Sequence, residues 1–319
     1  MFKRTETKHQ LSSSRILENE RARCISFLSG SYHSVLFETR GRISPFENGM
    51  LIISIDVDVG SKELGLINQG KNDRNVSSRL SEYEVGEIEE AALPEFIELF
   101  ERQEVPATFA IRGQLTEVHG SALETLAKSK VKHDIGAHGY YHRKFGNLSY
   151  DQAEAEIKMI SHGMQEFGLT PKSFIFPSNS VTHLELLEKY GYECYRDYSN
   201  FLHDSMCIKK HGELWEVHPS LLIDRYTKFA FLKRILDVAI KRKLPAHLWF
   251  HVRDFGKEFN EIKRNSKKVF VPFLSYSNKK EREGVLTFET MLSAARKAHA
   301  VAMTSSNFKP NQQQENRRP

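Results

Sequence analysis

The sequence predicts an α/β protein in which a parallel sheet or barrel carries its helices on the outside. Short apolar runs of strand length alternate with amphipathic segments of helical period along most of the chain. The 319 residues are more than twice a typical domain of about 150 residues, but a single α/β barrel also uses this length. The chain contains no internal repeat, which leaves one large unit as the simplest interpretation.

The predicted strands are short and rich in branched or aromatic residues. They cover Met50–Ile55, Ala107–Ile111, His133–Ala137, Ser173–Phe176, Leu214–Val217, Leu248–Phe250 and Ala300–Met303. The predicted helices have apolar residues at helical spacing or a clear start signal, such as a proline in the first turn or a serine N-cap. They cover Ile88–Phe100 with a restart at Pro94, Leu115–Ala127, Asp151–Phe167 behind Ser149, His183–Lys189, Phe229–Ile240 and Phe288–Lys297. Residues Gly60–Ser78 are too rich in turn residues to form an element.

The alternating pattern occupies residues 46–306, which we expect to form one domain. Residues 1–45 are an N-terminal extension with no clear period, and residues 307–319 have the composition of a disordered polar tail. The polar N-terminus lacks the apolar segment of a secretory signal, so we expect a cytoplasmic protein.

Composition excludes several classes of protein. A formal net charge of +5 is only mildly basic, which disfavours a dedicated nucleic-acid binder. Three widely spaced cysteines without a CxxC pair exclude a disulfide framework and a cysteine-rich zinc site. No stretch approaches the roughly 18 apolar residues of a membrane span.

Chemically active side chains follow three of the predicted strands. Asp56 and Asp58 end the first strand, and alternate residues of an extended chain share one face. His138 and His142 are four residues apart and can converge on one cation if the segment makes a helical turn. His251 ends a strand in which Leu248 and Phe250 alternate with Trp249 and His251. Each signal alone has a structural alternative: a loop-capping aspartate, a surface turn or a buried histidine.

Taken together, these residues form a typical catalytic set. The carboxyl ends of barrel strands meet at one face, where barrel enzymes carry their active sites. One carboxylate and two histidines bind a catalytic divalent metal while leaving positions open for water. A second carboxylate and a further histidine supply a base and an acid, so the set favours metal-assisted hydrolysis.

These residues resemble the motifs of the polysaccharide deacetylase family, the NodB-homology domain, over roughly Gly49–Asn307. Ser54-Ile-Asp56-Val-Asp58 resembles the first motif, in the spaced form of a cytosolic-type branch, and Val105–Ile111 resembles the second strand. His133-Asp-Ile-Gly-Ala-His138-Gly-Tyr-Tyr-His142 is similar to the second motif, with Gly139 in place of the usual serine or threonine. His247-Leu-Trp-Phe-His251 resembles the last motif.

The third motif departs from the family pattern. The family places an arginine near a proline at the end of the fourth strand, where it orients and charge-balances the catalytic aspartate. This chain has Phe174-Ile-Phe-Pro177-Ser178-Asn179 there, with no arginine beside Pro177. Arg253 and Arg196 are the two candidates to replace it. Without such an arginine the pKa of Asp56 would rise.

The resemblance implies a distorted (β/α) barrel with seven or eight parallel strands, a divalent metal that is usually zinc, and removal of an acetyl group from an N-acetylated amino sugar. It assigns the metal to Asp58, His138 and His142, the general base to Asp56 and the general acid to His251. The oxyanion and substrate contacts that we expect are Ser178, Asn179, Tyr140, Trp249 and Arg253, with Tyr141 and Trp215 as further stacking rings.

The charge distribution bears on the substrate. Ser81–Glu104 is acidic, whereas Arg225–Arg282 holds 16 Lys and Arg against 5 Asp and Glu. One interpretation is a solvated basic face, and the other is a phosphate-bearing substrate such as a nucleotide- or lipid-linked amino sugar. Two alternative functions stay open: a catalytically impaired sugar-binding protein and a hydrolase of another C–N amide bond.

Overall fold

The computed structural model describes residues 46–58, 92–118, 121–197, 206–256 and 258–304. The predictions for residues 1–45, for the segment Gly60–Ser78, for the first part of the acidic helix and for the tail 307–319 lie outside the described residues. Among the helices of the described part, none is both long and apolar enough to cross a membrane.

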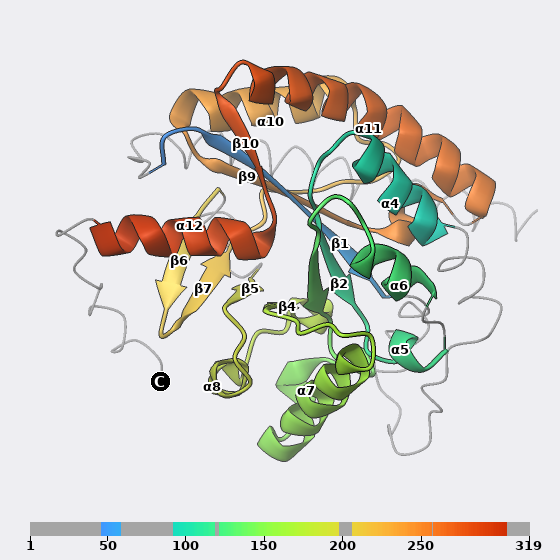
Figure 1. The fold of residues 1–319 in the computed structure, drawn as a ribbon, viewed down its shortest axis with the longest axis vertical. Coiled ribbons are helices and arrows are strands. Elements are labelled where there is room, and N and C mark those ends of the chain that lie inside the picture. Colours follow the sequence, from blue (N-terminus) through green and yellow to red (C-terminus); the bar gives the residue numbers. More distant parts are fainter. Residues whose placement is uncertain (1–45, 59–91, 119–120, 198–205, 257, 305–319) are drawn as a thin grey trace, which may run out of the picture.

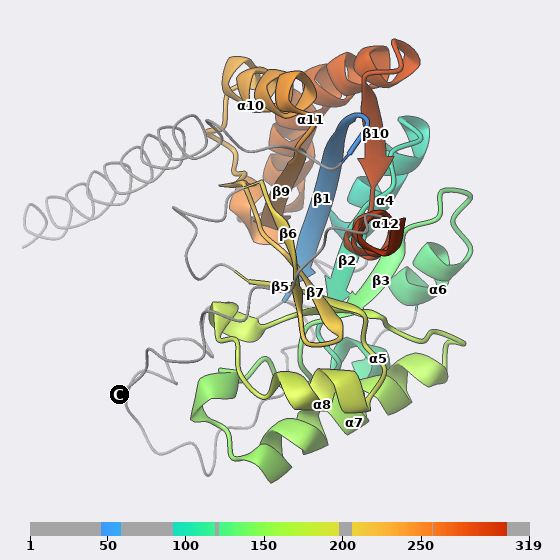
Figure 2. The same cartoon turned by 90° about the vertical axis from the view of Figure 1, so that its left-hand side faces the viewer.

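One sheet organises the described part of the chain, and its order is β6-β7-β5-β4-β3-β2-β1-β9-β8 with β10 beside β1 (Figures 1 and 2). The ten strands are β1 Gly49–Val57, β2 Thr108–Ile111, β3 Asp134–Ala137, β4 Ser173–Ile175, β5 Cys194–Arg196, β6 Ile208–His211, β7 Leu214–Val217, β8 Leu221–Leu222, β9 Pro245–His251 and β10 Leu286–Glu289. All described pairings are parallel except that of β6 with β7.

Strands β10 and β2 share one edge of β1, β10 along Gly49–Ile52 and β2 along Ser54–Val57. Strand β9 covers the other edge. Strands β10 and β2 lie end to end along this edge of β1 and together count as one position. The nine parallel strands therefore occupy eight positions around the curved sheet. The predicted α/β barrel of seven or eight parallel strands is therefore confirmed, with the antiparallel β6 as an addition.

A single stretch of chain connects the two sides of the curved sheet. Strand β7 pairs with β5, and β8, which begins four residues after β7 ends, pairs with β9. No ladder between β7 and β9 is found among the described residues. The barrel is thus completed there by the continuity of the chain.

The strands alternate between an inner face and an outer face, as the period of two requires. On β1, Leu51, Ile53 and Ile55 belong to the large outer cluster that packs against the helices. Met50 and Ile52 belong to a smaller inner cluster. Residues 54, 56 and 58 continue the inner series, which places a serine and two aspartates where the barrel opens.

Helices cover the outside of the barrel and close one end of it. They are α4 Leu93–Arg102, α5 Leu115–Val118, α6 Ser121–Ala127, α7 Tyr150–Gln165, α8 Leu184–Lys189, α10 Phe229–Arg242, α11 Phe259–Arg282 and α12 Met291–Thr304, with 3-10 turns η2 Phe145–Asn147, η3 Pro177–Asn179 and η4 Val252–Phe255. Helices α10 and α11 lie together on one side and α7 and α8 on the opposite side (Figures 1 and 2). The small side chains of α12 pack onto Met50, Ile52 and Trp215 of the inner cluster and close the end opposite Asp56.

Some predicted elements were wrong. Ala300–Met303, predicted as a strand, is the last turn of α12, and Phe288, predicted as helical, lies in β10. Periodicity cannot separate a four-residue apolar strand from one turn of a buried helix. Helix α11 was missed because its sequence is polar on average and contains Pro272. Leu115–Ala127 forms the two helices α5 and α6 instead of one.

A cluster of aromatic rings supports the turn that follows β9. Phe255, the last residue of η4, is fully buried and contacts the rings of Phe96, Phe250 and Phe270 at centroid distances of 5.6, 5.2 and 5.4 Å. Such tilted and edge-on ring contacts are favourable beyond the area they bury. The cluster fixes η4 and with it Arg253 and Asp254.

We expect Phe255→Ala to lower the free energy of unfolding by about 3 to 5 kcal/mol, because it leaves a cavity among three buried rings. Urea denaturation followed by circular dichroism measures this change. Phe229→Ala serves as the control, since this ring lies at the surface of α10 and its loss should cost much less. Equal costs for the two variants would contradict the buried position of Phe255.

Candidate active site

The sheet register brings the predicted residues to one end of the barrel. Asp56 of β1 lies opposite His251 of β9. On the other edge, Val57 pairs with Ile111 and Ile111 pairs with Ala137, so the residues that follow these strands leave the sheet side by side. This register places Asp58 near His138, although the two are 80 positions apart in the chain.

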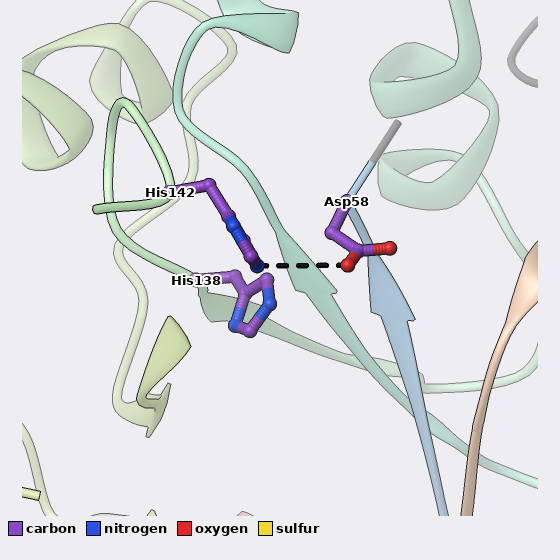
Figure 3. Close-up of side chains that lie close together, drawn as sticks. All are labelled: Asp58, His138 and His142. Atoms are coloured by element: carbon purple, nitrogen blue, oxygen red, sulfur yellow. Dashed lines mark ion pairs between the residues drawn. The ribbon is translucent and has the colours of Figure 1, made fainter. Parts of the chain in front are cut away.

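Asp58, His138 and His142 form a compact cluster of potential metal ligands (Figure 3). One ligand atom from each residue lies within 4.8 Å of the others, and all three side chains are buried. His142 Nε2 is 3.5 Å from Asp58 Oδ2. His138 Nδ1 donates a hydrogen bond to the carbonyl of Ile175 at 2.8 Å, which leaves Nε2 with its lone pair directed away from that bond.

The protonation states suit a metal. Burial lowers the pKa of His142 to about 3 and also lowers that of His138, so both imidazoles are neutral and able to ligate. Burial raises the pKa of Asp58, but the charges of His251 and Arg253 outweigh it, and the carboxyl stays ionised. His138 Nε2 is buried without a hydrogen-bond partner among the described residues. A buried lone pair of this kind is satisfied by a cation, so the donor set fits a divalent metal.

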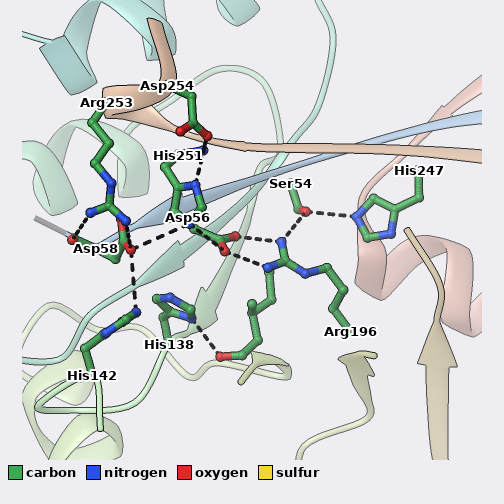
Figure 4. A network of polar contacts seen from close by, with 11 residues as sticks. Ser54, Asp56, Asp58, His138, His142, Arg196, His247, His251, Arg253 and Asp254 are labelled. Atoms are coloured by element: carbon green, nitrogen blue, oxygen red, sulfur yellow. Dashed lines mark hydrogen bonds and ion pairs between the residues drawn. The ribbon is translucent and has the colours of Figure 1, made fainter. Parts of the chain in front are cut away.

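Asp56 of β1 is held by an arginine of strand β5, which lies across the interior of the barrel (Figure 4). Arg196 Nη1 and Nη2 donate to the two carboxylate oxygens of Asp56, both at 2.6 Å, and the side-chain exposures are 1% and 3%. Burial raises the pKa of Asp56, but Arg196 and the nearby histidines outweigh it and hold the pKa far below its ordinary value. Of the two arginines considered from the sequence, Arg196 is the one that charge-balances Asp56.

The guanidinium of Arg196 is fixed from two further sides. Its Nη1 also donates to Ser54 Oγ at 3.2 Å, and Ser54 Oγ is hydrogen-bonded to His247 Nε2 at 2.8 Å (Figure 4). Its Cζ lies 4.2 Å from the centroid of the Trp249 ring, a cation–π contact. The inner residues of β1 and β9 therefore form the supporting surface for one buried arginine.

The pKa of His251 is shifted in the direction opposite to that of Asp56. Its Nδ1 and its backbone N–H both donate to Asp254 Oδ2 at 2.8 Å, and its Nε2 lies 3.8 Å from Asp56 Oδ2 and 3.7 Å from Asp58 Oδ2. Burial lowers the pKa of His251, but the charges of Asp58, Asp254 and Asp56 outweigh it and raise the pKa to about 9. The imidazole is thus protonated at neutral pH and can donate a proton.

Arg253, the second arginine considered from the sequence, binds Asp58. Its Nη2 donates to Asp58 Oδ2 at 2.9 Å and its Nη1 to the backbone carbonyl of Asp58 at 3.2 Å. The side chain is 29% exposed, compared with 4% for Asp58. Arg253 therefore lies on the solvent side of the cluster, where we expect a substrate to enter.

The remaining predicted substrate contacts lie at different depths. Ser178 is exposed and Asn179 is half-buried in the turn η3 after β4, and both have left-handed backbone angles. Tyr140 is buried and contacts the ring of Tyr141 edge-on. Their contact with a substrate stays a prediction, as does that of Trp249. Trp215 is not available as a stacking ring, because it lies in the inner cluster and packs against α12.

Sequence reasoning missed several supporting residues. Asp254 lies three residues after His251, a spacing that by itself predicts no interaction. Neither Ser54 nor His247 belongs to a pattern that would mark it as a functional residue. The strand alternation that predicted an inward-facing His251 also places Ser54 and His247 on the inner face of the sheet. This alternation could therefore have identified both residues.

An ionised carboxylate, a protonated imidazole and a candidate metal cluster lie together at the open end of the (β/α) barrel, an arrangement that suits a hydrolase. Residues 80–195 match the family profile described as polysaccharide deacetylase. Among solved structures, a protein from Mycobacterium smegmatis described as a polysaccharide deacetylase is similar to this chain, with a TM-score of 0.62 and 14% identity over 84% of this chain and 96% of that one. No match to a curated protein sequence was found.

Two further structures share the fold. A protein from Pseudomonas aeruginosa PAO1, also described as a polysaccharide deacetylase, gives a TM-score of 0.57 at 16% identity and covers 82% of this chain and 92% of its own. Puue allantoinase gives 0.58 at 17% identity with the same coverages of 82% and 92%. The profile match covers residues 80–195, and the solved structures share the fold of this chain.

Removal of Arg196 should strongly destabilise the fold. We expect Arg196→Met to lower the free energy of unfolding by about 3 to 5 kcal/mol, because it leaves the Asp56 carboxylate buried without its partner. The double variant Arg196→Met/Asp56→Asn should cost less than the sum of the two single variants, since neither position then carries an unpaired buried charge. Urea denaturation of the four proteins in this cycle measures the coupling.

Arg296→Met provides the matched control. Arg296 also binds a carboxylate with two nitrogens, that of Glu193, but its side chain is 59% exposed. Exposed pairs contribute only about 0 to 1 kcal/mol. Additive costs in the Arg196 and Asp56 cycle, or a cost no larger than that of the control, would contradict a tightly coupled buried pair.

Proposed function

We propose that this protein is a zinc-dependent N-deacetylase that removes the acetyl group from an N-acetylated amino sugar and releases acetate. The observation that carries the proposal is the arrangement of Asp56, His251 and the Asp58 cluster. A carboxylate held ionised and a protonated imidazole lie beside a potential metal site, in a chain whose residues 80–195 match a polysaccharide deacetylase profile. The catalytic domain that we propose spans residues 46–306, and its cytoplasmic location stays a prediction.

Asp58, His138 and His142 would hold the metal, which when bound supplies Lewis acidity to an amide carbonyl and lowers the pKa of water. Asp56, kept ionised by Arg196, accepts the proton of the attacking water. His251, kept protonated by Asp254, donates a proton to the nitrogen of the departing amine. The attack forms the C–O bond to water, and the C–N bond breaks as the amine takes its proton, so the products are acetate and a free amino sugar.

The turn η3 supplies the polar backbone that this reaction needs. The amide of Asn179 already donates to the carbonyl of Phe176 at 3.0 Å. The amide of the exposed Ser178, one residue earlier in the turn, is our candidate donor to the oxyanion that forms from the acetyl carbonyl. The left-handed conformation of both residues turns this backbone at the end of β4.

For the substrate we favour an amino sugar that carries phosphate. Most of the basic residues between Arg225 and Arg282 lie on α10 and α11, on the outer wall of the barrel. Several of them are paired there, such as Lys263 with Glu95 and Lys233 with Asp237. Among the described basic residues of this range, Arg253 reaches the active site, and a guanidinium on the solvent side of the cluster suits a phosphate group.

Hydrolysis of another C–N bond is the second candidate, because Puue allantoinase shares the fold. The third interpretation, a catalytically impaired sugar-binding protein, was based on the missing arginine of the third motif. The bidentate contact of Arg196 with Asp56 removes that reason.

Elemental analysis of the purified protein combined with an acetate-release assay tests the proposal. The substrates are UDP-linked N-acetylglucosamine, free N-acetylglucosamine and neutral chito-oligosaccharides. We expect bound zinc and preferential acetate release from the UDP-linked sugar. Equal rates on neutral oligosaccharides would overturn the preference for phosphate, and no acetate release from any of these sugars would overturn the deacetylase proposal.

Two variants separate the metal site from the base. His138→Ala should abolish zinc binding and activity together, because it removes one of three ligands. Asp56→Asn should retain zinc but lower kcat by about 10²- to 10⁴-fold, the usual contribution of a general base. Zinc content and acetate release are measured on the same preparations. Retained turnover in Asp56→Asn would contradict its role as the base.

The pH profile of activity should depend on Asp254. Because the pKa of His251 is raised to about 9, the protonated imidazole persists into the alkaline range and is lost as pH rises through that value. Asp254→Asn removes one of the charges that raise the pKa, so the alkaline limb of kcat/KM should move to lower pH. Asp237→Asn, on the outer helix α10, should leave the limb in place. An unchanged limb in Asp254→Asn would show that another group sets it.

A further inference from the structure

We propose that Glu156 of α7 is a positioning residue that holds the segment His138–His142 in the conformation in which its two imidazoles face Asp58. This inference rests on the proposed metal site and goes beyond the residues of that site. Glu156 lies on the inner face of its helix and touches none of the three ligand side chains by a described hydrogen bond or ion pair. It acts on the backbone between the two histidines.

The carboxylate of Glu156 receives donors from three of the four residues 140–143. Its Oε2 accepts the backbone N–H of Tyr140 at 2.6 Å and that of Tyr141 at 2.8 Å. Its Oε1 accepts Arg143 Nε at 2.5 Å. The side chain of Glu156 is 0% exposed, whereas that of Arg143 is 36% exposed. The buried carboxylate is thus charge-balanced and bound on both oxygens, as a buried charge requires.

The segment needs such an anchor because it is not part of a helix. Gly139 has φ of +66° and His142 φ of +58°, so the backbone turns in the left-handed region on both sides of the two tyrosines. Successive amides in such a turn point the same way and form a concave anion site. On its other side the segment is held through its carbonyls, which accept from the amides of Gly113 and Gln114 at 2.8 and 3.2 Å.

Gly139 shows why a carboxylate from another element takes this position. The family usually has a serine or threonine there, which provides a hydroxyl group. A Cβ atom on Gly139 would lie 3.0 Å from Pro177 Cγ, and the left-handed φ disfavours any side chain. The same Cβ position is 3.6 Å from Glu156 Oε2. The carboxylate of Glu156 therefore lies beside the place from which the hydroxyl would extend, and it supplies an acceptor that glycine cannot.

The test compares Glu156→Gln with Glu154→Gln in the full-length protein. Glu154 lies on the same helix and also binds a cation and a hydroxyl, those of Lys189 and Tyr190, but not the histidine segment. Both variants lose one negative charge from α7. The affinity for Co²⁺ is measured by competition with a chromophoric chelator, and the visible spectrum of the bound Co²⁺ reports its coordination.

We expect Glu156→Gln to weaken Co²⁺ binding by about 10- to 100-fold, as is usual when a partner that orients metal ligands is lost. It should also speed hydrogen exchange of the Tyr140 and Tyr141 amides while the strand amides stay protected. Glu154→Gln should bind Co²⁺ like the wild type. If Glu156→Gln fails to fold, Glu156→Asp, which keeps the charge and shortens its reach, should show the same weakening.

Wild-type affinity and spectrum in Glu156→Gln, or in Glu156→Asp where that variant is used, would overturn the role of Glu156 and leave the proposed function untouched. Absence of Co²⁺ binding by the wild-type protein would overturn the proposed metal site, and this inference with it. The two failures are therefore distinguishable in one experiment.

Discussion

The active end of this barrel depends on a single buried ion pair. The pair of Asp56 and Arg196 joins strand β1 to β5 across the interior, and Trp249, Ser54 and His247 are arranged around the guanidinium. Without the arginine, the pKa of this carboxyl would be higher, because burial raises it and Arg196 supplies the largest opposing charge. The same pair therefore determines both the packing of the interior and the charge of the residue proposed as the base.

The other charged side chains of the site surround this pair with alternating sign. With Asp56 neutralised by Arg196, the protonated His251 is shared between Asp254, Asp58 and Asp56, and Arg253 adds a second cation to Asp58. The two aspartates lie two residues apart on one strand, yet each has its own arginine. One carboxylate thus faces the candidate metal cluster, while the other keeps the lone pair that the proposed base requires.

The fold and the clustering of the candidate metal ligands could be predicted from the sequence because both depend on local patterns. Strand alternation placed Asp56 and Asp58 on one face, and the spacing of His138 and His142 indicated a shared cation. The supporting contacts could not be predicted, because they join segments far apart in the chain: Arg196 and Asp56 are 140 positions apart. Likewise, nothing local marks Glu156 as the partner of the histidine segment, since a glutamate on an amphipathic helix usually faces solvent.

The position of Arg196 also bears on how relatives of this protein are sorted into active and inactive members. A search of aligned motifs would find no arginine beside Pro177 and would score the site as defective. In space, however, a guanidinium from the adjacent strand meets the same carboxylate with two hydrogen bonds. An arginine from β5 can thus replace one expected after the neighbouring strand β4 while the contacts of the aspartate stay the same. Catalytic activity is therefore better judged from three-dimensional contacts than from aligned sequence motifs.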